Sequence, residues 1–170
     1  DYYASRGLGD VYKRQVLGRV DFRLIHGQVV TRWIKLYPAK EIVIVDDILG
    51  DDPFMADIYE MSAPQGIRVS IVKLAEAKNK IETMNEDVFL LTKNIETMEK
   101  LISQGLTCSK LIVGGVPSED EKKFITNGVY LSKNDIDLLK NIELAGSKVI
   151  CQATPEDIEL TIEKAEQKLN

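Results

Sequence analysis

The run EIVIV at residues 41–45 limits the possible fold of this chain more than any other stretch. Successive side chains of a β-strand point to opposite faces of a sheet, and here isoleucines and valines supply both faces. Such a strand is typical of a parallel sheet that helices cover on each side. The sequence predicts further strands at 16–20, 67–73, 87–92, 109–115, 128–132 and 148–154.

Between these strands, apolar residues recur at the spacing of a helix, which places Trp33 in the core. Asp52 precedes Pro53, a pair that is typical of a helix start. Gly105 and Gly146 stand where a left-handed residue commonly ends a helix. We predict helices at 27–37, 51–63, 74–84, 94–105, 133–146 and 155–169.

Strands that alternate with helices imply right-handed crossovers. With 170 residues, 44% of them hydrophobic, the chain suits one core. We therefore expect a single α/β domain at residues 16–170, with an open, mostly parallel sheet and helices on both faces. In residues 1–15, DYYASRGLGDVYKRQ, apolar residues recur with neither the period of a strand nor that of a helix. We interpret these residues as a non-native or disordered extension. The alternative is an arm that docks on a partner or on a neighbouring copy.

Composition argues against several classes of function. The chain has 27 acidic and 22 basic residues and a formal charge of -5, which disfavours nucleic acid as a partner. No apolar run approaches the ~20 residues that span a bilayer, and the start of the chain lacks the apolar core of a signal peptide. We therefore expect a cytoplasmic protein.

The sequence predicts no metal site. Cys108 and Cys151 lie far apart and, with His26 as the one histidine, form no pattern of zinc ligands. We interpret both cysteines as buried thiols in a reducing compartment. Asp46 and Asp47 resemble a metal-binding pair, but without a third carboxylate they are better explained as the end of a strand.

The loop after the first strand, DFRLIHG, carries the main candidate for chemistry. Loops at the carboxyl ends of parallel strands gather at one edge, where sites form. His26 precedes Gly27 at an expected helix start, where backbone N–H groups favour an anion. Arg23 can grip phosphoryl oxygens, and Asp21 can hold that arginine or accept a proton from the imidazole. The other ring nitrogen of His26 then remains a nucleophile, which predicts phosphoryl transfer.

Two rival classes do not fit this loop. Histidine phosphatases and phosphoglycerate mutases require an Arg-His-Gly motif and a second histidine, whereas Ile25 precedes His26 and the chain has no other histidine. A hydrolase triad would require a serine in a G-x-S-x-G elbow, which is also absent from the sequence.

Two other loops should reach the same edge. The Thr92 hydroxyl could donate a hydrogen bond to a phosphoryl group, or the residue could help Asn94 to cap the next helix. Gly114 and Gly115 could let backbone amides approach the site, or could be plain turn residues. The residues alone leave both pairs of alternatives open.

The stretch RVDFRLIHGQV at 19–29 resembles the phosphorylation-site signature of one family, whose usual form is R-[IV]-D-x-R-L-I-H-G-Q-V. The family comprises the IIB components of the mannose/fructose/sorbose branch of the bacterial phosphoenolpyruvate:sugar phosphotransferase system (PTS). The runs FLLTKN and IVGGV also resemble its later loops, so the resemblance extends from Val16 to the end of the chain.

The resemblance implies a protein-phosphohistidine:sugar phosphotransferase. A IIA protein passes its phosphoryl group to His26, on Nδ1, and the group then moves to a sugar that the membrane components IIC and IID bring across. No cofactor or metal is implied. The residues expected to bind the phosphoryl group are Arg23, Gly27, Gln28, Thr92, Gly114 and Gly115, with Asp21 orienting Arg23 or the imidazole.

The chain has no room for a fused IIA domain, so we expect the donor to be a separate chain. The protein should associate peripherally with the membrane permease during turnover. The alternative is a non-catalytic regulatory or binding module on the same fold, which senses the phosphorylation state of the system.

Overall fold

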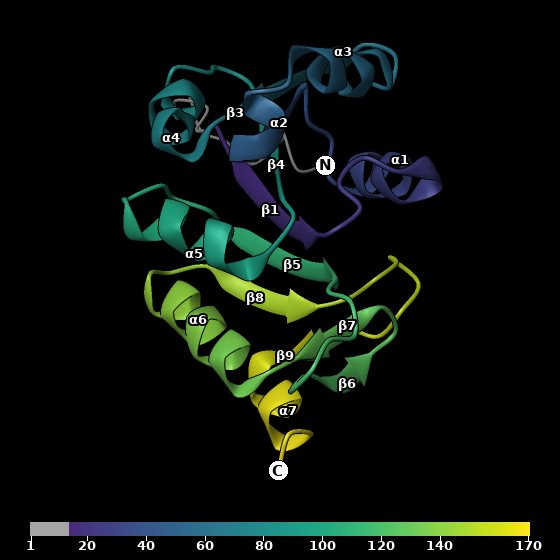
Figure 1. Ribbon diagram of the computed structural model, residues 1–170, viewed down its shortest axis with the longest axis vertical. Helices are drawn as coiled ribbons and strands as arrows, with labels where there is room; N and C mark the ends of the chain where they lie inside the picture. The colour runs from purple at the N-terminus through teal and green to yellow at the C-terminus, as the bar shows by residue number, and fades with distance from the viewer. Residues whose placement is uncertain (1–13) are drawn as a thin grey trace, which may run out of the picture.

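The computed structural model describes residues 14–170, with the side chains of residues 28–30 excepted. Its main sheet is the open, mostly parallel sheet that the sequence predicts (Figure 1). All neighbouring strands are parallel except the last pair, which is antiparallel. The order across the sheet is β3 (Arg68–Val72), β2 (Glu41–Val45), β4 (Val88–Thr92), β1 (Val16–Asp21), β5 (Lys110–Gly115), β8 (Lys148–Cys151) and β9 (Leu160–Thr161).

Helices cover both faces of the sheet, as predicted. One apolar cluster joins the sheet to α1 (Gly27–Leu36), α2 (Asp47–Gly50) and α3 (Pro53–Met61). A second cluster on the opposite face joins it to α4 (Leu74–Glu82), α5 (Ile95–Ser103), α6 (Lys133–Leu144) and α7 (Ile162–Gln167). Trp33 of α1 is fully buried in the first cluster, as expected.

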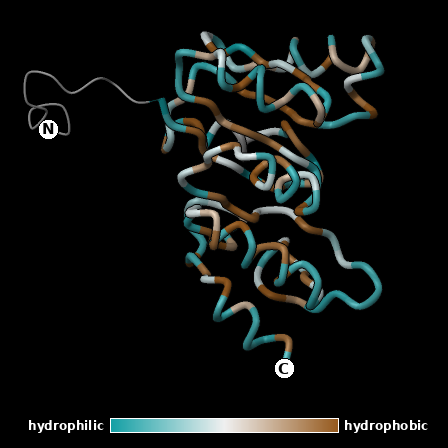
Figure 2. The backbone as a smooth tube through the Cα atoms, turned by 90° about the vertical axis from the view of Figure 1, so that its left-hand side faces the viewer, coloured by the Kyte–Doolittle hydropathy of each residue, from teal (hydrophilic) through white to brown (hydrophobic). Residues whose placement is uncertain are grey.

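Alternation along the strands explains the two clusters. In β4, Val88 and Leu90 belong to the cluster under α4 and α5, whereas Phe89 and Leu91 belong to the cluster under α1 and α3. The EIVIV strand β2 divides in the same way. Figure 2 shows these strands as hydrophobic segments through the interior of the molecule. Each fully buried aliphatic side chain stabilises the fold by about 1.5–3 kcal/mol.

The structure confirms the predicted start of α3 and the predicted ends of α5 and α6. The Asp52 carboxylate accepts a hydrogen bond from the Met55 amide at 3.1 Å, and Pro53 is the first residue of α3. Gly105 and Gly146 follow α5 and α6 with φ of +97° and +107°. Their left-handed conformation ends these helices, as expected of glycine at that position.

The predicted helix at 155–169 is wrong in its first half. Residues 152–159 form an irregular connection, a two-residue strand β9 pairs with β8, and only then does α7 begin at Ile162. Asp157 fixes this connection by accepting hydrogen bonds from the Thr154 amide at 2.9 Å and the Thr154 hydroxyl at 3.0 Å. This local turn and the pairing with β8 outweigh the helical spacing of the sequence.

The predicted strand at 128–132 is present, but not in the main sheet. It is β7 (Val129–Leu131), which forms a hairpin with β6 (Lys123–Thr126), a strand that the sequence pattern does not reveal. The hairpin joins the main sheet through a bridge between Val116 and Val129. The short helix α2 was also missed, because one helical turn is too short to show a period.

Candidate active site

The predicted site lies at the carboxyl edge of the sheet, between the end of β1 and the start of α1 (Figure 1). The turn that forms it places Leu24 at a φ of +56°, which is costly for a residue other than glycine. The conformation is held because the Leu24 amide donates to the Asp21 carbonyl at 2.9 Å and the Leu24 side chain is buried beside Trp33. This turn brings His26 back over the end of β1.

Asp21 is the centre of the site. Its side chain is only 1% exposed. Arg23 donates to Oδ1 through Nε at 2.9 Å and through its backbone amide at 3.1 Å, and to Oδ2 through Nη2 at 3.0 Å. Burial would raise the pKa of Asp21, but the hydrogen bonds from Arg23 and the charge of Arg19 outweigh it and lower that pKa. Asp21 is therefore ionised at neutral pH.

Arg19 is a site residue that the sequence reasoning missed. Its guanidinium is buried and donates to Asp21 Oδ2 at 3.2 Å and to the carbonyls of Gln152 at 3.2 Å and Ala153 at 2.8 Å. It also lies 5.0 Å from the centre of the Trp33 ring. Burial lowers the pKa of Arg19 to about 10, and the charge of Asp21 limits the fall, so Arg19 stays protonated at neutral pH. The available signal was a charged residue inside the apolar strand VLGRVD.

Gly114 and Gly115 make room for these buried charges. A Cβ on Gly114 would overlap the Arg19 guanidinium, and one on Gly115 would overlap the Asp21 carboxylate. Both glycines lie in β5, so they are not plain turn residues. The Gly115 carbonyl also accepts a hydrogen bond from the Phe22 amide at 3.0 Å, which holds the loop to β5. Their absent side chains thus let β1 present an aspartate and an arginine where a sheet usually packs apolar groups.

His26 stands at the start of α1, where the sequence places it. It is the residue before the helix, with extended backbone, and its side chain is 24% exposed. Its Nε2 lies 3.3 Å from Asp21 Oδ2. An ionised carboxylate can only accept, so the contact requires a proton on Nε2, and in that neutral tautomer the lone pair lies on Nδ1. Nδ1 has no hydrogen-bond partner among the residues that the structure describes.

Arg23 supplies exposed positive charge beside the imidazole. Its side chain is 39% exposed, and its guanidinium lies 5.5 Å from the centre of the Phe22 ring. Two of its three nitrogens bind Asp21. Together Arg19, Arg23 and Asp21 carry a net charge of +1, so the site attracts an anion. Asp21, Arg23 and His26 are thus brought together as predicted.

Thr92, Gly27 and Gln28 are the other residues that the sequence predicts to bind the phosphoryl group. The Thr92 hydroxyl is buried and donates to the Asn94 carbonyl at 2.9 Å, while the Asn94 side chain caps α5 by accepting from the Thr97 amide at 2.9 Å. This geometry favours the helix-start interpretation of Thr92. Gly27 is the first residue of α1, with φ of +39°. The Gln28 side chain lies outside the described part of the structure.

A model of the family described as the PTS system sorbose subfamily IIB component matches residues 15–170 of this chain. The chain belongs to this family of PTS IIB components. The fructose-specific EIIB component of Bacillus subtilis (strain 168) is 31% identical over 145 residues, which cover 84% of this chain and 89% of the relative. The sorbose-specific EIIB component of Klebsiella pneumoniae is 31% identical over 149 residues, which cover 86% and 91%.

Solved structures agree with the fold of this IIB component. The IIBSor domain of the sorbose permease from Klebsiella pneumoniae has a TM-score of 0.82 and 30% identity, covering 91% of this chain and 97% of the domain. The manxB protein from Thermoanaerobacter tengcongensis has a TM-score of 0.84 and 35% identity, covering 91% and 96%. The single α/β domain with a mostly parallel sheet is therefore confirmed, as is the predicted resemblance to the PTS IIB components. The IIB component functions in phosphoryl transfer to a sugar.

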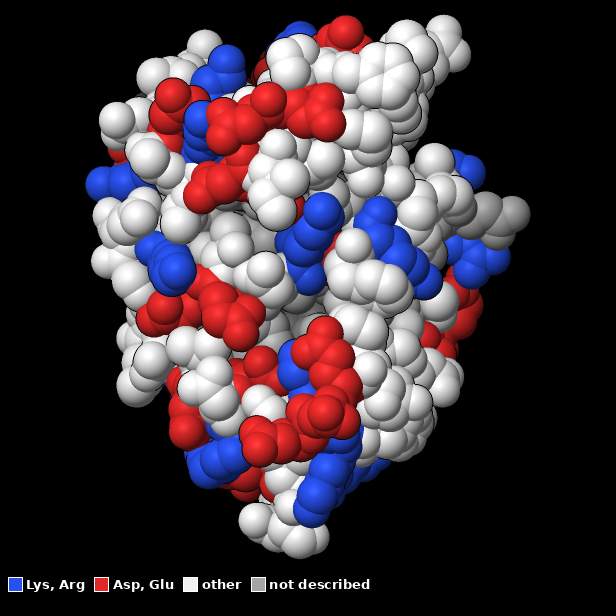
Figure 3. Space-filling model, in the orientation of Figure 1, with Lys and Arg blue, Asp and Glu red and all other residues white. Residues whose placement is uncertain are grey.

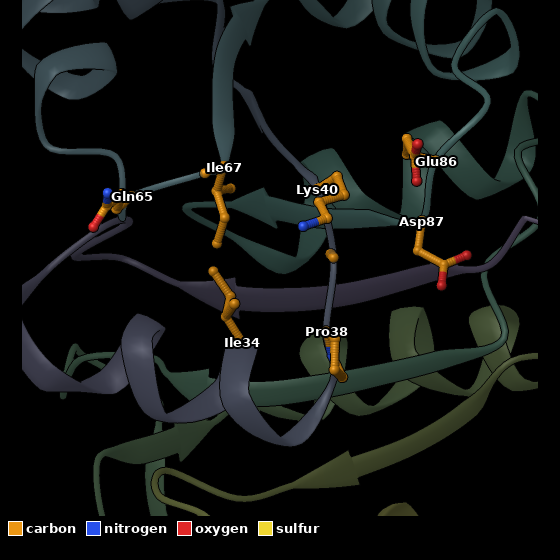
Figure 4. Close-up of a pocket in the computed structure, with 9 residues that line it drawn as sticks. Ile34, Pro38, Lys40, Gln65, Ile67, Glu86 and Asp87 are labelled. Atoms are coloured by element: carbon orange, nitrogen blue, oxygen red, sulfur yellow. The ribbon is translucent and has the colours of Figure 1, made fainter. Parts of the chain in front are cut away.

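The two described cavities of the IIB component lie away from His26. One, of about 370 Å³, is lined by Ile34, Pro38, Lys40, Ile67 and Asp87, which belong to α1 or to loops that precede strands (Figure 4). The other, of about 430 Å³, is lined by residues around Arg68 and Lys80. Neither has His26 in its lining. The histidine lies on a loop with its side chain 24% exposed.

The aspartate pair and the two cysteines have the structural roles that the sequence predicts. Asp46 caps α2 by accepting from the Leu49 amide at 2.8 Å, and Asp47 accepts from the Leu74 amide at 2.7 Å. Cys108 and Cys151 are buried and free, and burial raises the pKa of Cys108 to about 11 and that of Cys151 to about 12. Among the described residues, no group of three or more histidine, cysteine or acidic side chains is placed to hold a metal.

The surface charges and the hydropathy of the helices also bear on the expectations from composition. Acidic and basic side chains are interspersed on the face shown in Figure 3. None of the helices within residues 14–170 is both long and apolar enough to cross a bilayer.

Proposed function

We propose that His26 is the residue that carries the phosphoryl group, accepting it on Nδ1 from the phosphohistidine of a IIA protein and passing it to a sugar held by the membrane components IIC and IID. The observation that carries this assignment is the contact of His26 Nε2 with the buried, ionised Asp21 at 3.3 Å. This contact supports the tautomer with the proton on Nε2, in which Nδ1 is the nucleophile.

In the first step, the Nδ1 lone pair attacks the phosphorus of the donor phosphohistidine. The new P–N bond forms as the old one breaks, and the donor ring takes back its electron pair. The His26 ring becomes positively charged during this step, and Asp21 stabilises that charge through Nε2–H. In the tautomer with its proton on Nε2, Nδ1 carries the lone pair, so that form needs no proton transfer to act as the nucleophile.

In the second step, a sugar hydroxyl oxygen attacks the same phosphorus. The P–N bond to His26 breaks, Nδ1 recovers its electron pair, and the hydroxyl proton leaves to solvent or to a base of the acceptor. The neutral ring that results, protonated on Nε2, is the state from which the cycle began.

Arg23 and the start of α1 stabilise the moving group. Phosphoryl transfer passes through a loose transition state in which positioning and charge stabilisation supply most of the catalysis. The part of the Arg23 guanidinium that does not bind Asp21 is available to the equatorial oxygens. Gly27 and Gln28 are the first two residues of α1, where backbone N–H groups have no partner within the helix and the positive end of the helix dipole adds to the attraction of an anion.

Thr92, Gly114 and Gly115 have weaker support as phosphoryl ligands. The Thr92 proton is already donated to the Asn94 carbonyl, so the hydroxyl must rotate before it can donate to an oxygen of the phosphoryl group. The two glycines act on the site through the space they give to Arg19 and Asp21. We therefore propose Arg23, Gly27 and Gln28 as the principal phosphoryl-binding residues.

We further assign the chain to the mannose/fructose/sorbose branch as a cytoplasmic protein that associates with its permease during turnover. Relatives named for fructose, sorbose and mannose support the branch. The phosphocarrier domain is residues 16–170, and the preceding residues take no part in the chemistry. Deletion of residues 1–13 should leave the phosphorylation rate unchanged, and a tenfold loss would show that they do take part.

Labelling tests the assignment of His26. The protein is incubated with radiolabelled phosphoenolpyruvate, enzyme I, the general phosphocarrier protein and a cognate IIA protein. We expect acid-labile label on the wild type and none on His26→Gln, with circular dichroism showing that the variant is folded. Label that persists on His26→Gln, or a wild type that takes none, would contradict the proposal. Transfer is then measured to mannose, fructose and sorbose in membranes that contain IIC and IID.

A further inference from the structure

Helix α3 leaves an apolar face that no other described part of the chain covers. Alone among the described helices of eight or more residues, it has no buried residue. Met55 and Tyr59 pack partly against the core, while Phe54, Ile58 and Met61 are 72%, 41% and 81% exposed. Positions 54, 58 and 61 recur at the spacing of one helical face. A row of three large apolar side chains on one helix is more than scattered surface exposure.

The exposed row continues toward the site edge. Ile48 on α2 is 80% exposed, α2 packs against α3, and α2 follows directly from the carboxyl end of β2. We call Ile48, Phe54, Ile58 and Met61 the α3 stripe. Since α3 covers the same face of the sheet as α1, the stripe flanks the helix that begins beside His26 (Figure 1).

The segment that carries the α3 stripe is acidic. The segment 46–65 contains six acidic residues and no lysine or arginine. Asp46 pairs with Lys93 at 3.4 Å and Asp51 with Lys73, but Asp57 and Glu60 on α3 have no ionic partner in the described part of the chain. In Figure 3, acidic side chains gather over the part of the surface where Figure 1 places α2. The partner of the stripe should therefore present apolar side chains among basic ones.

We propose that the α3 stripe docks on the cytoplasmic face of the membrane permease that holds the accepting sugar, a proposal that rests on the proposed function. Cytoplasmic loops of membrane proteins carry an excess of lysine and arginine, which complements Asp57 and Glu60. The same acidic charges repel anionic lipid headgroups, so the stripe binds the permease protein and not the bilayer surface. Anchoring at α3 leaves the His26 loop beside it, free to reach the bound sugar.

The test separates the two half-reactions. The double variant Phe54→Ser, Met61→Ser removes two side chains that are mostly solvent-exposed, so the fold is retained. The matched control is Leu144→Ser, which removes an 86% exposed leucine at the end of α6. Each protein is first labelled by IIA in solution, and the phosphorylated form is then titrated into inverted vesicles that contain IIC and IID.

We expect the double variant to accept label from IIA within twofold of the wild-type rate. Its concentration for half-maximal sugar phosphorylation should rise about tenfold or more, as when anchors of an interface are removed. Leu144→Ser should change neither value. The charge variant Asp57→Asn, Glu60→Gln should weaken vesicle binding at low salt and have little effect at high salt.

Other outcomes would overturn the proposal. An unchanged titration of the double variant would show that the stripe is not a docking surface. A loss of the IIA reaction alone would place the donor on it, a loss of self-association in sedimentation would place a second copy there, and equal binding to phosphatidylglycerol vesicles without permease would indicate lipid. Failure of the wild type to take label at His26 would instead refute the proposed function. The labelling by IIA in solution detects that failure before any vesicle is added.

Discussion

The substitution Asp21→Asn tests the chemistry of the site most sharply, because it keeps the shape of the side chain and changes its charge and its donors. In the protein, the carboxylate accepts from Arg19, from three nitrogens of Arg23 and from His26. An asparagine amide can donate to Nε2, which would move the imidazole proton to Nδ1 and remove the nucleophile. Loss of the analogous tautomer control in a catalytic triad costs about 10⁴ in rate.

The same substitution also destabilises the fold. Arg19 is buried and Asp21 is its one ionic partner among the described residues, so Asp21→Asn leaves a buried positive charge uncompensated. Breaking a buried ion pair by removing one partner costs about 3–5 kcal/mol. We expect a loss near the lower end of that range, because the Gln152 and Ala153 carbonyls continue to accept from Arg19.

The assay measures both effects. Single-turnover labelling by phosphorylated IIA should slow by about 10²–10⁴-fold, the range between loss of one electrostatic stabiliser and loss of the tautomer. Urea unfolding should give the stability loss. Asp46→Asn is the matched control, since Asp46 lies at the same edge, caps α2 and pairs with Lys93. A labelling rate for Asp21→Asn within threefold of that of the wild type would refute the reasoning.

The pH dependence of stability has a definite sign. The pKa of folded Asp21 is below the ordinary value of 3.8, so the carboxylate stabilises the fold fully above that value. This contribution is lost as the pH falls from about 3.8 through the folded pKa. The difference in unfolding free energy between wild type and Asp21→Asn should therefore shrink in acid, and a difference that stays constant down to pH 2 would contradict the assignment.

Three further variants follow. Arg23→Ala should slow phosphoryl transfer by about 10²–10³-fold with little change in fold, as single-turnover labelling will measure; an unchanged rate would assign Arg23 to surface charge. Gly114→Ala should lower the unfolding free energy by about 3 kcal/mol or more, because its Cβ displaces Arg19; Gly50→Ala, whose Cβ would crowd only the flexible Lys73 side chain, is the control, and equal stabilities would refute the close contact. Thr92→Val should cost about 1–3 kcal/mol and leave the labelling rate within threefold; a hundredfold slower rate would make Thr92 a phosphoryl ligand.

The sequence predicts the part of the site that is local along the chain. Asp21, Arg23 and His26 lie within six residues on one turn, so their spacing and the start of the following helix were enough to group them. Strand β2 and the covered parallel sheet were predictable for the same reason, because the isoleucine and valine alternation reports burial directly.

The parts that were missed depend on contacts between distant segments. Arg19 meets Gly114 only because β1 pairs with β5, and it meets Ala153 only because the connection after β8 crosses back over the site. The helix predicted at 155–169 failed for a related reason. Its apolar residues do recur at helical spacing. The turn at Thr154 and Asp157 and the pairing of β9 with β8 nevertheless replace the first half of the helix, and the spacing of apolar residues reveals neither of them.

The most direct test of the central claim is the site of the phosphoryl group on the imidazole. The protein is labelled with ¹⁵N, phosphorylated through IIA, and its ring nitrogens are observed by NMR. His26 is the one histidine of the chain, so its ring signals need no further assignment. We expect phosphorus coupling at Nδ1 and a proton retained at Nε2, opposite Asp21. Phosphorus coupling at Nε2, or phosphate on any other residue, would contradict it.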